Sequence, residues 1–295
     1  MSIRVRVPAT TANLGPGFDA MGLGLDWWDS LEADPSDDLR VEVTGEGAGR
    51  VPLDERHLVV QTIRAGLRRF GHPDPGMAFT LRAHNRIPHS RGMGSSAAAI
   101  VAGYALAWGL ARPGEELDRT ELLELATQDE GHPDNAAAAV FGGAVLAWRR
   151  SARDATGCVH LRVHPDVTTR VWIPAGELRT AAARGVLPAE LPREQVVAQA
   201  SRAALLVHAL ADEPTELFEA TQDWLHQQQR GALMPASLGL MERLRGAGVA
   251  AVVSGAGPTI IALGTRDQLA ASDAVEHHGF MRHDVAVGGG VELHA

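Results

Sequence analysis

The chain has 295 residues, 45% hydrophobic and 21% charged, which is ordinary for a soluble globular protein and long enough for two domains with cores of their own. Its formal net charge of −9 argues against a nucleic-acid surface, because Lys and Arg contacts with phosphates dominate that kind of binding. The sequence contains no lysine, so all 27 side chains counted as Lys plus Arg are arginines. A Walker-type phosphate loop, which ends in Gly-Lys-Ser or Gly-Lys-Thr, is therefore excluded.

Cysteine content and hydropathy bear on the compartment. The single cysteine, Cys158, cannot form an intrachain disulfide, so nothing implies an oxidising environment. Residues 3–7 alternate apolar and polar side chains, which predicts a strand and not the core of a signal peptide. The most apolar run, residues 97–110, is too short to span a bilayer. We therefore expect a cytoplasmic protein that does not enter a membrane.

The first half of the chain mixes strand and helix patterns. Period-two alternation predicts strands at 3–7 and 39–44, and apolar residues at helical spacing predict helices at 54–69, 97–110 and 119–130. A further strand is expected at 79–81, a helix start at 136–139 and a strand within 141–148. The segment Thr10–Asp19 is polar and interrupted by glycine, which suggests a site-forming loop. The helix at 97–110 is apolar on nearly all faces and should be buried.

A polar, charged link at 149–154 precedes the second half, and we expect a domain boundary between residues 150 and 170. Beyond it the pattern predicts a strand at 171–173, helices at 194–210, 215–228 and 238–245, and strands at 249–253 and 259–263 around the turn 254–258. Strand-like alternation closes the chain at 285–287 and 291–293. Because strands and helices mix without strict alternation, the expected fold class is α+β.

The segment Pro88-His89-Ser90-Arg91-Gly92-Met93-Gly94-Ser95-Ser96-Ala97-Ala98-Ala99 is a glycine- and serine-rich turn that leads into an alanine-rich helix. Glycines let backbone N–H groups approach an anion closely, and a helix N-terminus presents unpaired donors with a partial positive charge. This arrangement suits phosphate. The alternative is a glycine-rich turn that merely caps the helix.

Two further segments suggest chemistry near that loop. Glu130-Gly131-His132-Pro133-Asp134-Asn135 gathers four potential ligands or donors, and a carboxylate beside a phosphate loop is a natural Mg²⁺ ligand. Ser95 or Ser96 could supply a second oxygen, although Glu130 could also be a solvated surface group. Ser254-Gly255-Ala256-Gly257-Pro258-Thr259 lies between two predicted strands; it suits either a simple hairpin turn or close backbone approach to a large anion.

Together these segments carry a resemblance. Residues 8–25, 85–99 and 254–259 resemble the three signature motifs of the GHMP small-molecule kinases. Within that superfamily the chain is similar to the homoserine kinases, through residues 11–19 and through residues 131–135 followed by Gly142-Gly143. The resemblance runs over essentially the whole chain. It implies a two-domain α+β fold, with a mixed α+β ATP-binding domain in residues 1–160 and a ferredoxin-like α+β domain in residues 161–295.

The resemblance also implies roles for individual residues. The triphosphate of ATP would be wrapped by Pro88, His89, Ser90, Arg91, Gly92, Met93, Gly94, Ser95, Ser96, Ala97 and Ala98, and Mg²⁺ would be held by Glu130 with Ser95 or Ser96. The substrate would be bound by Asn13, Asp19, His132, Asn135, Thr180, Arg184 and Arg230, and catalysis would depend on Glu130, Asn135, Thr180 and Arg184. Asp19 suits the ammonium group of an amino acid, and the two arginines suit its carboxylate. On the residues alone, both arginines would be taken as surface groups.

Some mechanistic points stay open at this level. Phosphoryl transfer needs mainly alignment and charge neutralisation, so the proton of the substrate hydroxyl could pass to Asp134 or to the γ-phosphate itself. Arg91 could contact phosphate or be solvated on the outer face of the loop. The chain departs from the family pattern at His57, where an Asn is usual near the adenine pocket, and at Trp224 and Gln228-Gln229 ahead of Arg230.

The resulting expectation is an ATP- and Mg²⁺-dependent kinase, a homodimer by resemblance, that phosphorylates the side-chain hydroxyl of L-homoserine in threonine biosynthesis. The alternatives are another GHMP kinase acting on a small alcohol such as mevalonate or shikimate, and an inactive sensor of a metabolite. Asp19, Arg184 and Arg230 favour an α-amino acid as substrate. Glu130 with Ser95-Ser96 argues against an inactive protein, because loss of Mg²⁺ ligands is an easy route to inactivity.

Overall fold

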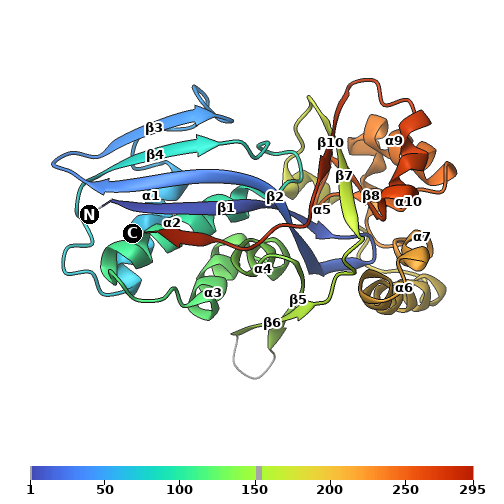
Figure 1. Ribbon diagram of the computed structural model, residues 1–295, viewed down its shortest axis with the longest axis horizontal. Coiled ribbons are helices and arrows are strands. Elements are labelled where there is room, and N and C mark those ends of the chain that lie inside the picture. Colours follow the sequence, from blue (N-terminus) through green and yellow to red (C-terminus); the bar gives the residue numbers. More distant parts are fainter. Residues whose placement is uncertain (1, 151–154, 295) are drawn as a thin grey trace.

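The computed structural model describes residues 2–150 and 155–294, which form two β-sheets side by side with helices packed against each (Figure 1). Part of the predicted link, residues 151–154, lies outside the described residues. The larger sheet follows the order β11-β1-β2-β4-β3, with β5 paired to β2 and β6 paired to β5. Its strands are β1 (Ile3–Asn13), β2 (Gly17–Pro35), β3 (Arg40–Gly45), β4 (Phe79–Asn85), β5 (Ala144–Arg150), β6 (Ala155–Leu161) and β11 (Glu292–His294).

The long antiparallel pair of β1 and β2 corrects one prediction. The two strands pair from Ile3 opposite Ala33 to Asn13 opposite Gly17, so most of the segment expected as an irregular loop at 10–19 is strand. Only residues 14–16 form a turn, and Leu14 and Gly15 close it with positive φ angles of 48° and 80°. The polar side chains that suggested a loop instead lie at the end of a strand, where they can be held rigidly.

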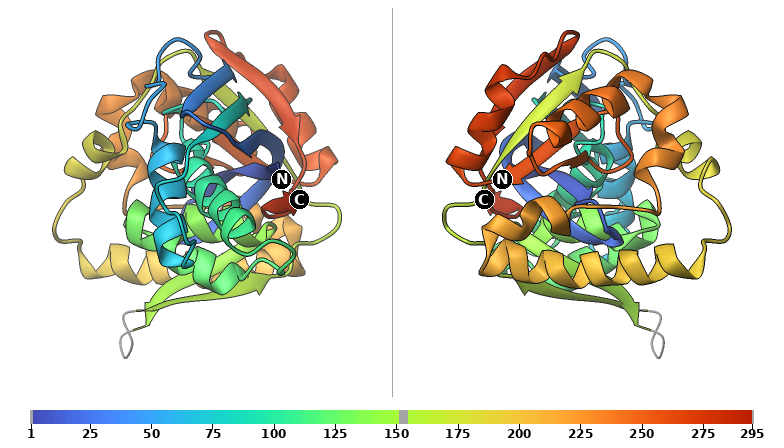
Figure 2. Two further views of the ribbon diagram at one scale, coloured as in Figure 1. Left: turned by 90° about the vertical axis from the view of Figure 1, so that its left-hand side faces the viewer. Right: turned by 90° about the vertical axis from the view of Figure 1, so that its right-hand side faces the viewer.

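Four helices lie beside the larger sheet: α1 (Leu58–Arg69), α2 (Ser95–Ala111), α3 (Arg119–Glu130) and α4 (Pro133–Phe141) (Figure 2). α2 and α4 pack on its strands, α1 packs on α2, and α3 packs on α2 and α4. The predicted burial of the helix at 97–110 is confirmed, because nearly every residue from Ala97 to Gly109 of α2 is buried. α1 is shorter than predicted. Residues 54–57 form turns, in which the Asp54 carboxylate accepts a hydrogen bond from the backbone N–H of Arg56.

The smaller sheet has the strand order β10-β7-β9-β8, and its strands are β7 (Thr168–Pro174), β8 (Ala251–Val253), β9 (Ile260–Gly264) and β10 (Phe280–Val285). All of its pairs are antiparallel, as in a ferredoxin-like sheet. Its helices are α5 (Thr180–Gly185), α6 (Arg193–Ala211), α7 (Leu217–Ala220), α8 (Gln227–Arg230), α9 (Pro235–Gly246) and α10 (Arg266–Ala270), with short 3₁₀ turns at 214–216, 231–233 and 271–274. Trp172 of β7 packs in a core with Leu240, Met241 and Leu244 of α9. The α+β prediction is confirmed.

The helix predicted over 215–228 is wrong. A 3₁₀ turn and the short α7 end at Ala220, and α8 starts only at Gln227. The Asp223 carboxylate accepts hydrogen bonds from the backbone N–H groups of Leu225, His226 and Gln227. A short polar side chain that binds nearby backbone donors in this way competes with a continuous helix. The strand predicted at 285–287 is also misplaced, because β10 ends at Val285.

Both described ends of the chain belong to the larger sheet. Residues Arg4–Arg6 of β1 pair with Glu292–His294 of β11, and the N- and C-terminal ends lie side by side (Figure 1). The last strand therefore crosses back from the smaller sheet to the larger one. Within residues 2–150 and 155–294, no helix is both long and apolar enough to cross a membrane.

Candidate active site

The three motif segments meet in space, although contacting residues lie up to 243 positions apart in the sequence. The N–H of Gly255 donates to the carbonyl of Ala12 at 3.1 Å, which joins the turn between β8 and β9 to the end of β1. The hydroxyl of Ser254 bonds to the Thr11 hydroxyl at 2.8 Å and donates to the carbonyl of Gly92 at 2.5 Å. The loop before α2 is therefore anchored on both of the other segments.

The glycines of residues 88–96, the predicted phosphate loop, are required by packing. A Cβ on Gly94, which has φ of 70°, would lie 1.8 Å from the Thr10 hydroxyl oxygen of β1. A Cβ on Gly92, with φ of 74°, would lie 2.2 Å from the carbonyl oxygen of Ser254. The loop thus sits tightly on β1, and α2 begins at Ser95 with no side-chain cap on its first N–H groups. Those donors stay free for an anion.

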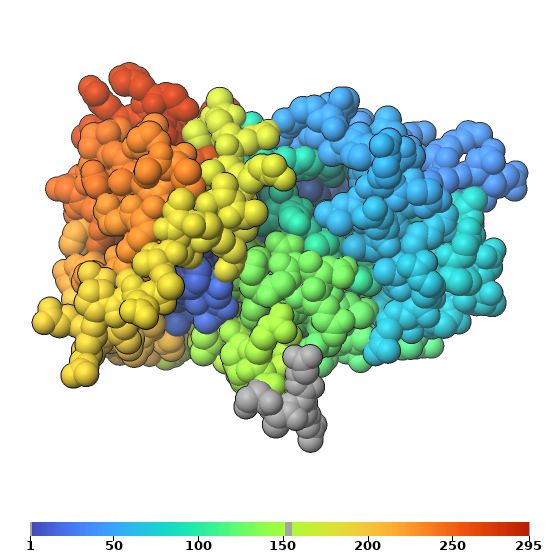
Figure 3. Space-filling model, turned by 180° about the vertical axis from the view of Figure 1, so that it is seen from behind, coloured from blue at the N-terminus to red at the C-terminus, as the bar shows by residue number. Residues whose placement is uncertain are grey.

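The loop opens onto a cavity between the two sheets. On the surface this is the hollow between the segment that carries α5 (yellow) and the part that carries the start of α2 (Figure 3). The lining combines residues from both halves of the chain: Ala12, Asn13, Asp19, Ser90, Gly92, Gly94, Ser95, Ser96, Glu130, His132, Asp134, Asn135, Leu178, Arg179, Thr180, Arg184, Arg230 and residues 255–257. Every residue predicted to bind substrate or Mg²⁺ lines this one cavity.

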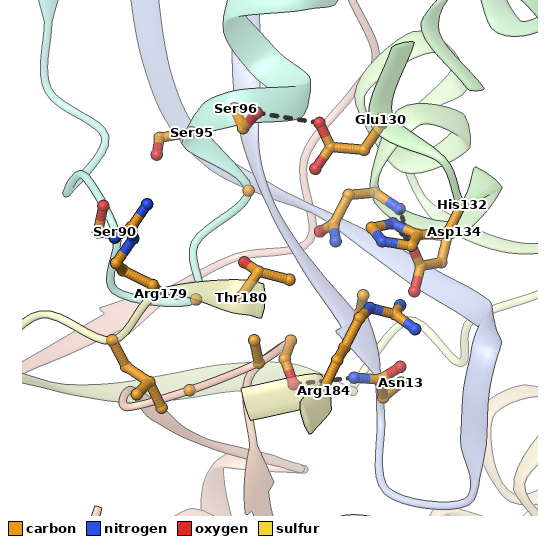
Figure 4. Close-up of a pocket in the computed structure, with 18 of the residues that line it drawn as sticks. Asn13, Ser90, Ser95, Ser96, Glu130, His132, Asp134, Arg179, Thr180 and Arg184 are labelled. Carbon is orange, nitrogen blue, oxygen red and sulfur yellow. Dashed lines mark hydrogen bonds and ion pairs between the residues drawn. The ribbon is translucent and has the colours of Figure 1, made fainter. Parts of the chain in front are cut away.

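Glu130 lies at the α2 side of the cavity, at the end of α3. Its carboxylate accepts a hydrogen bond from the Ser96 hydroxyl at 3.0 Å (Figure 4). Burial raises the pKa of Glu130, with only partial compensation from the Ser96 bond and from Arg184. The result is a half-buried carboxylate and a hydroxyl, both hard oxygen donors, next to the free N–H groups of α2.

Asp134, Asn135 and His132 lie at the start of α4. Asp134 is 2% exposed, and burial raises the pKa of its carboxyl to about 7 even though it accepts the Asn135 N–H at 2.7 Å. The side-chain oxygen of Asn135 accepts from the Thr10 hydroxyl at 2.8 Å, which fixes the amide. Burial lowers the pKa of His132, so its imidazole is neutral at pH 7, and its buried Nδ1 has no hydrogen-bond partner among the described residues.

Asp19 and Arg184 face each other at the other end of the cavity. The Arg184 guanidinium donates both Nη groups to the two Asp19 carboxylate oxygens, at 3.0 and 2.6 Å, and both side chains stay about one-third exposed. Asp19 has a positive φ of 55°, and its backbone N–H donates to the side-chain oxygen of Asn13 at 3.0 Å. This is the bidentate, oppositely charged pair that a zwitterion would match.

Arg230 is 1% exposed, so the surface interpretation of this arginine is wrong. Its guanidinium donates to the carbonyls of Ala183 and Gly255, and its Nη1 lies 3.0 Å from Nδ1 of His226. Burial, together with the nearby charge of Arg184, lowers the pKa of Arg230 to about 10. The Phe18 ring lies 5.5 Å from its guanidinium carbon.

The side chain of Arg91 matches neither of the alternatives that the sequence left open. Its guanidinium turns to the smaller sheet and donates to the carbonyls of Pro174 at 3.1 Å and Ala175 at 3.0 Å. It also lies 3.6 Å from the carboxylate of Glu46. Its side chain is 16% exposed. Arg91 therefore joins the phosphate loop to the end of β7, and its charge is already matched.

A second cavity adjoins the first, because Ser90, Ser95 and Ser96 line both. The rest of its wall is largely apolar and is made by Val7, Asp29, Leu31, Val51, Pro52, Arg56, His57, Leu58, Val59, Ala83, Asn85, His89 and Ala99. His57 is 6% exposed, and its Nδ1 has no hydrogen-bond partner in the described chain. Asp29, which the sequence did not single out, accepts from the backbone N–H groups of Arg86 and Ile87, and burial raises its pKa to about 6.

Among the loop residues expected to hold ATP, Ser90, Gly92, Gly94, Ser95 and Ser96 line the first cavity, and His89 lines the second. Pro88, Met93, Ala97 and Ala98 are buried beneath the loop. Leu178 and Arg179 were missed. No motif marks them, since they reach the site only because the segment that leads into α5 folds against the loop. Thr10 lies within the first motif segment, but its hydrogen bond to Asn135 was not predicted.

Comparisons with known proteins agree with this geometry. The family model of the GHMP kinases N terminal domain matches residues 57–143, and that of the GHMP kinases C terminal matches residues 204–279. A homoserine kinase of Cutibacterium acnes is 54% identical over 294 residues, which covers 99% of both chains. One from Streptomyces coelicolor is 46% identical, covering 90% of this chain and 85% of the relative.

Solved structures extend the likeness. The crystal structure of homoserine kinase from Cytophaga hutchinsonii matches with a TM-score of 0.81 and 28% identity over 99% of this chain and 97% of the other. Mevalonate diphosphate decarboxylase from Staphylococcus aureus matches with a TM-score of 0.70 at 15% identity, over 100% of this chain and 98% of the other, which is a likeness of fold alone. From its motifs, its fold and its relatives, the chain belongs to the GHMP kinases and, among them, to the homoserine kinase family.

Proposed function

We propose that this protein transfers the γ-phosphoryl group of ATP to the side-chain hydroxyl of L-homoserine, which yields O-phospho-L-homoserine for threonine biosynthesis. The observation that carries the proposal is the pair of Asp19 and Arg184 in the same cavity as Glu130, Ser96 and the free N-terminus of α2. One end of this cavity suits a zwitterionic amino acid and the other suits phosphate.

ATP use follows from membership of the kinase family, and we assign the two ends of the nucleotide to the two adjoining cavities. The largely apolar second cavity suits the nucleoside, and the triphosphate would pass Ser90 and Ser95 to reach the N-terminus of α2. Mg²⁺ fits the oxygen donors of Glu130 with Ser96 or Ser95, since Mg²⁺ needs only one or two protein ligands beside phosphate oxygens. When bound, it would neutralise charge on the phosphates.

The remaining residues would place the amino acid. Asp19 would take the ammonium group, and Arg184 with Arg230 would take the carboxylate, which would exchange the existing Asp19–Arg184 pair for two pairs with substrate. Asn13 orients Asp19 through its backbone N–H. Asn135, His132 and Thr180 line the space between this end and Glu130, where the reacting hydroxyl would lie. The role of each is alignment, which is the main requirement of a loose phosphoryl transition state.

We keep the domain division proposed from the sequence, with ATP binding assigned to residues 1–160 and the second domain to 161–295. The two sheets support it, because β6 ends at Leu161 and β7 begins at Thr168. β11 is the exception, since it returns to the first sheet. A homodimer stays a prediction from family resemblance.

The proposed activity is tested by measuring ADP release from MgATP against homoserine, serine, threonine, mevalonate and shikimate. We expect turnover with homoserine that exceeds every other alcohol in kcat/KM. Turnover with mevalonate but not homoserine would move the protein to another GHMP kinase activity. No turnover with any alcohol would favour a sensor that binds without reacting.

The raised pKa of Asp134 predicts a pH-dependent stability. The carboxyl ionises near 3.8 when unfolded and near 7 when folded, so the native state binds more protons between those values and its free energy of unfolding falls as pH rises from about 4 to about 7. Asp19, Glu130 and Arg184 face this carboxyl and contribute to its pKa. The variant Asp134→Asn has no carboxyl to ionise and so lacks that loss. Above pH 7 we expect its free energy of unfolding to exceed that of the parent by a few kcal/mol, because each unit of pKa shift corresponds to about 1.4 kcal/mol.

Urea unfolding at pH 5 and pH 8 measures this difference. If the free energies of unfolding of parent and variant differ by the same amount at pH 5 and at pH 8, Asp134 has an ordinary pKa in the folded protein. The kcat of the same variant decides the proton acceptor: a loss of about a hundredfold or more would identify Asp134 as the general base. Retained kcat would leave the γ-phosphate as the acceptor.

A further inference from the structure

Most cations near the phosphate loop are already committed. Arg91 is bonded to the carbonyls of Pro174 and Ala175 and lies near Glu46, away from the cavity. Arg184 is held by Asp19 in a bidentate pair, and Arg230 is buried against backbone carbonyls and His226. Since the chain has no lysine, an ammonium group cannot fill the place of the phosphate-loop lysine found in Walker-type sites.

Arg179 differs from these three arginines. It lines the cavity, its side chain is exposed, and its guanidinium makes no hydrogen bond or ion pair with any residue of the described chain, 2–150 and 155–294. Its backbone position is nevertheless fixed, because the N–H of the preceding Leu178 donates to the carbonyl of Ser90 in the phosphate loop at 3.0 Å. The guanidinium lies on the Ser90 side of the cavity, across from Ser95 and Ser96 (Figure 4).

The distribution of charged side chains around the cavity sets Arg179 apart from the other two arginines that line it. Three carboxylates line it (Asp19, Glu130 and Asp134), and so do three guanidinium groups (Arg179, Arg184 and Arg230). Arg184 and Arg230 lie toward Asp19, so Arg179 is the guanidinium nearest the phosphate loop among the described lining residues. A transferring phosphoryl group spreads negative charge over three oxygens, and the planar fork of an arginine matches two of them.

We propose that Arg179 contacts the γ-phosphoryl group of ATP and stabilises its charge during transfer, as a catalytic residue contributed by the segment between β7 and α5. The proposal rests on the proposed function, because it requires a phosphoryl donor in this cavity. It makes the two walls complementary: one carries the backbone N–H groups of α2 and the Glu130 site, and the other carries a guanidinium that has no partner among the described residues. The exposed Arg179 side chain is largely hydrated before the nucleotide binds. Its charge is not spent on another protein group of the described chain, so it can act fully on the phosphate.

The test compares Arg179→Ala, Arg179→Lys and the parent by equilibrium binding and by turnover. For Arg179→Ala we expect kcat with homoserine to fall by at least about tenfold, below the 10³–10⁵ of fully enclosed arginine fingers because this side chain is exposed. The Kd for the magnesium complex of a non-hydrolysable ATP analogue should rise about fivefold or more, and the Kd for MgADP, which lacks the γ-phosphate, should not change. Arg179→Lys should recover part of both losses, since it keeps a point charge without the fork.

Arg193→Ala is the matched control, because it removes an exposed arginine at the start of α6 that does not line the cavity. If Arg179→Ala behaves like this control in both kcat and analogue binding, the proposal is wrong. Equal weakening of the ATP analogue and of MgADP would also overturn it, because the arginine would then act on the shared α- and β-phosphates. Failure of the proposed function is distinguishable, since the parent itself would then show no turnover with homoserine while the two binding measurements could still be compared.

Discussion

Glu130→Ala should reduce kcat with homoserine by roughly a thousandfold at ordinary Mg²⁺ concentrations, because a metal contributes several kcal/mol of charge stabilisation to such a reaction. Glu130 is the carboxylate bonded to Ser96 at the N-terminus of α2, and burial already raises its pKa. Truncation to alanine removes this half-buried carboxylate from the proposed metal site beside the N-terminus of α2. Glu130→Gln preserves the shape but not the charge, and should lose nearly as much.

The measurement is steady-state turnover over a titration of Mg²⁺, with binding of MgADP as a second readout. Glu121→Ala is the control, since it removes a carboxylate from the start of the same helix, where Glu121 pairs with Arg69 at the surface. We expect the Glu130 variants to need far more Mg²⁺ for residual activity, and the Glu121 variant to behave like the parent. Near-normal kcat for Glu130→Ala would remove this residue from the metal site.

The sequence predicts those parts of the fold that depend on local pattern. α2 is apolar on every face and is buried, and the alternation in residues 3–7 does mark a strand. The predicted helix at 215–228 fails because Asp223 binds three backbone donors beyond it, a choice between two hydrogen-bonding arrangements that helical spacing does not reveal. The prediction of a loop at 10–19 is wrong for a related reason. Backbone pairing between β1 and β2 makes most of this segment strand, although its composition is typical of a loop.

The site, too, has residues that the sequence predicts and residues that it does not. Glu130 and Ser96 are close in space because each ends or begins a helix beside the loop, and motif composition is enough to suggest them. The main partners of the arginines at the site cannot be read from the sequence, since they are distant along the chain. Arg91 binds Pro174 and Ala175, and Arg230 binds Gly255, through backbone carbonyls that carry no signature of their own. Arg179 was missed because its significance is the lack of any such partner in the described chain.

These assignments explain how a lysine-free chain can handle a triphosphate. The glycines of the loop are needed to pack it on β1 and on the turn at 254–257, and that packing holds the first N–H groups of α2 in the cavity. Arg91, the arginine within the loop, joins that loop to the end of β7, so its guanidinium is turned away from the proposed phosphate site. The cavity arginines can then be divided between the phosphoryl group and the amino acid.

Arg184 and Asp19 carry the second large prediction. Arg184→Met should lower kcat/KM for homoserine about a hundredfold, mainly through KM, because removing one partner of a hydrogen-bonded charge pair costs about 2–5 kcal/mol. Asp19→Asn should lose a similar factor. In the free protein each of the two side chains satisfies the other, so either change also leaves its partner without a counter-charge.

Truncated substrates separate binding from that structural effect. 3-Aminopropan-1-ol lacks the carboxylate of homoserine, and 4-hydroxybutyrate lacks its ammonium group. If Arg184 binds the carboxylate, Arg184→Met should leave the low kcat/KM for 3-aminopropan-1-ol nearly unchanged while it lowers that for 4-hydroxybutyrate. Asp19→Asn should show the reverse pattern. Equal losses on both analogues would mean that the pair only supports the local structure, and that the amino acid is recognised elsewhere in the cavity.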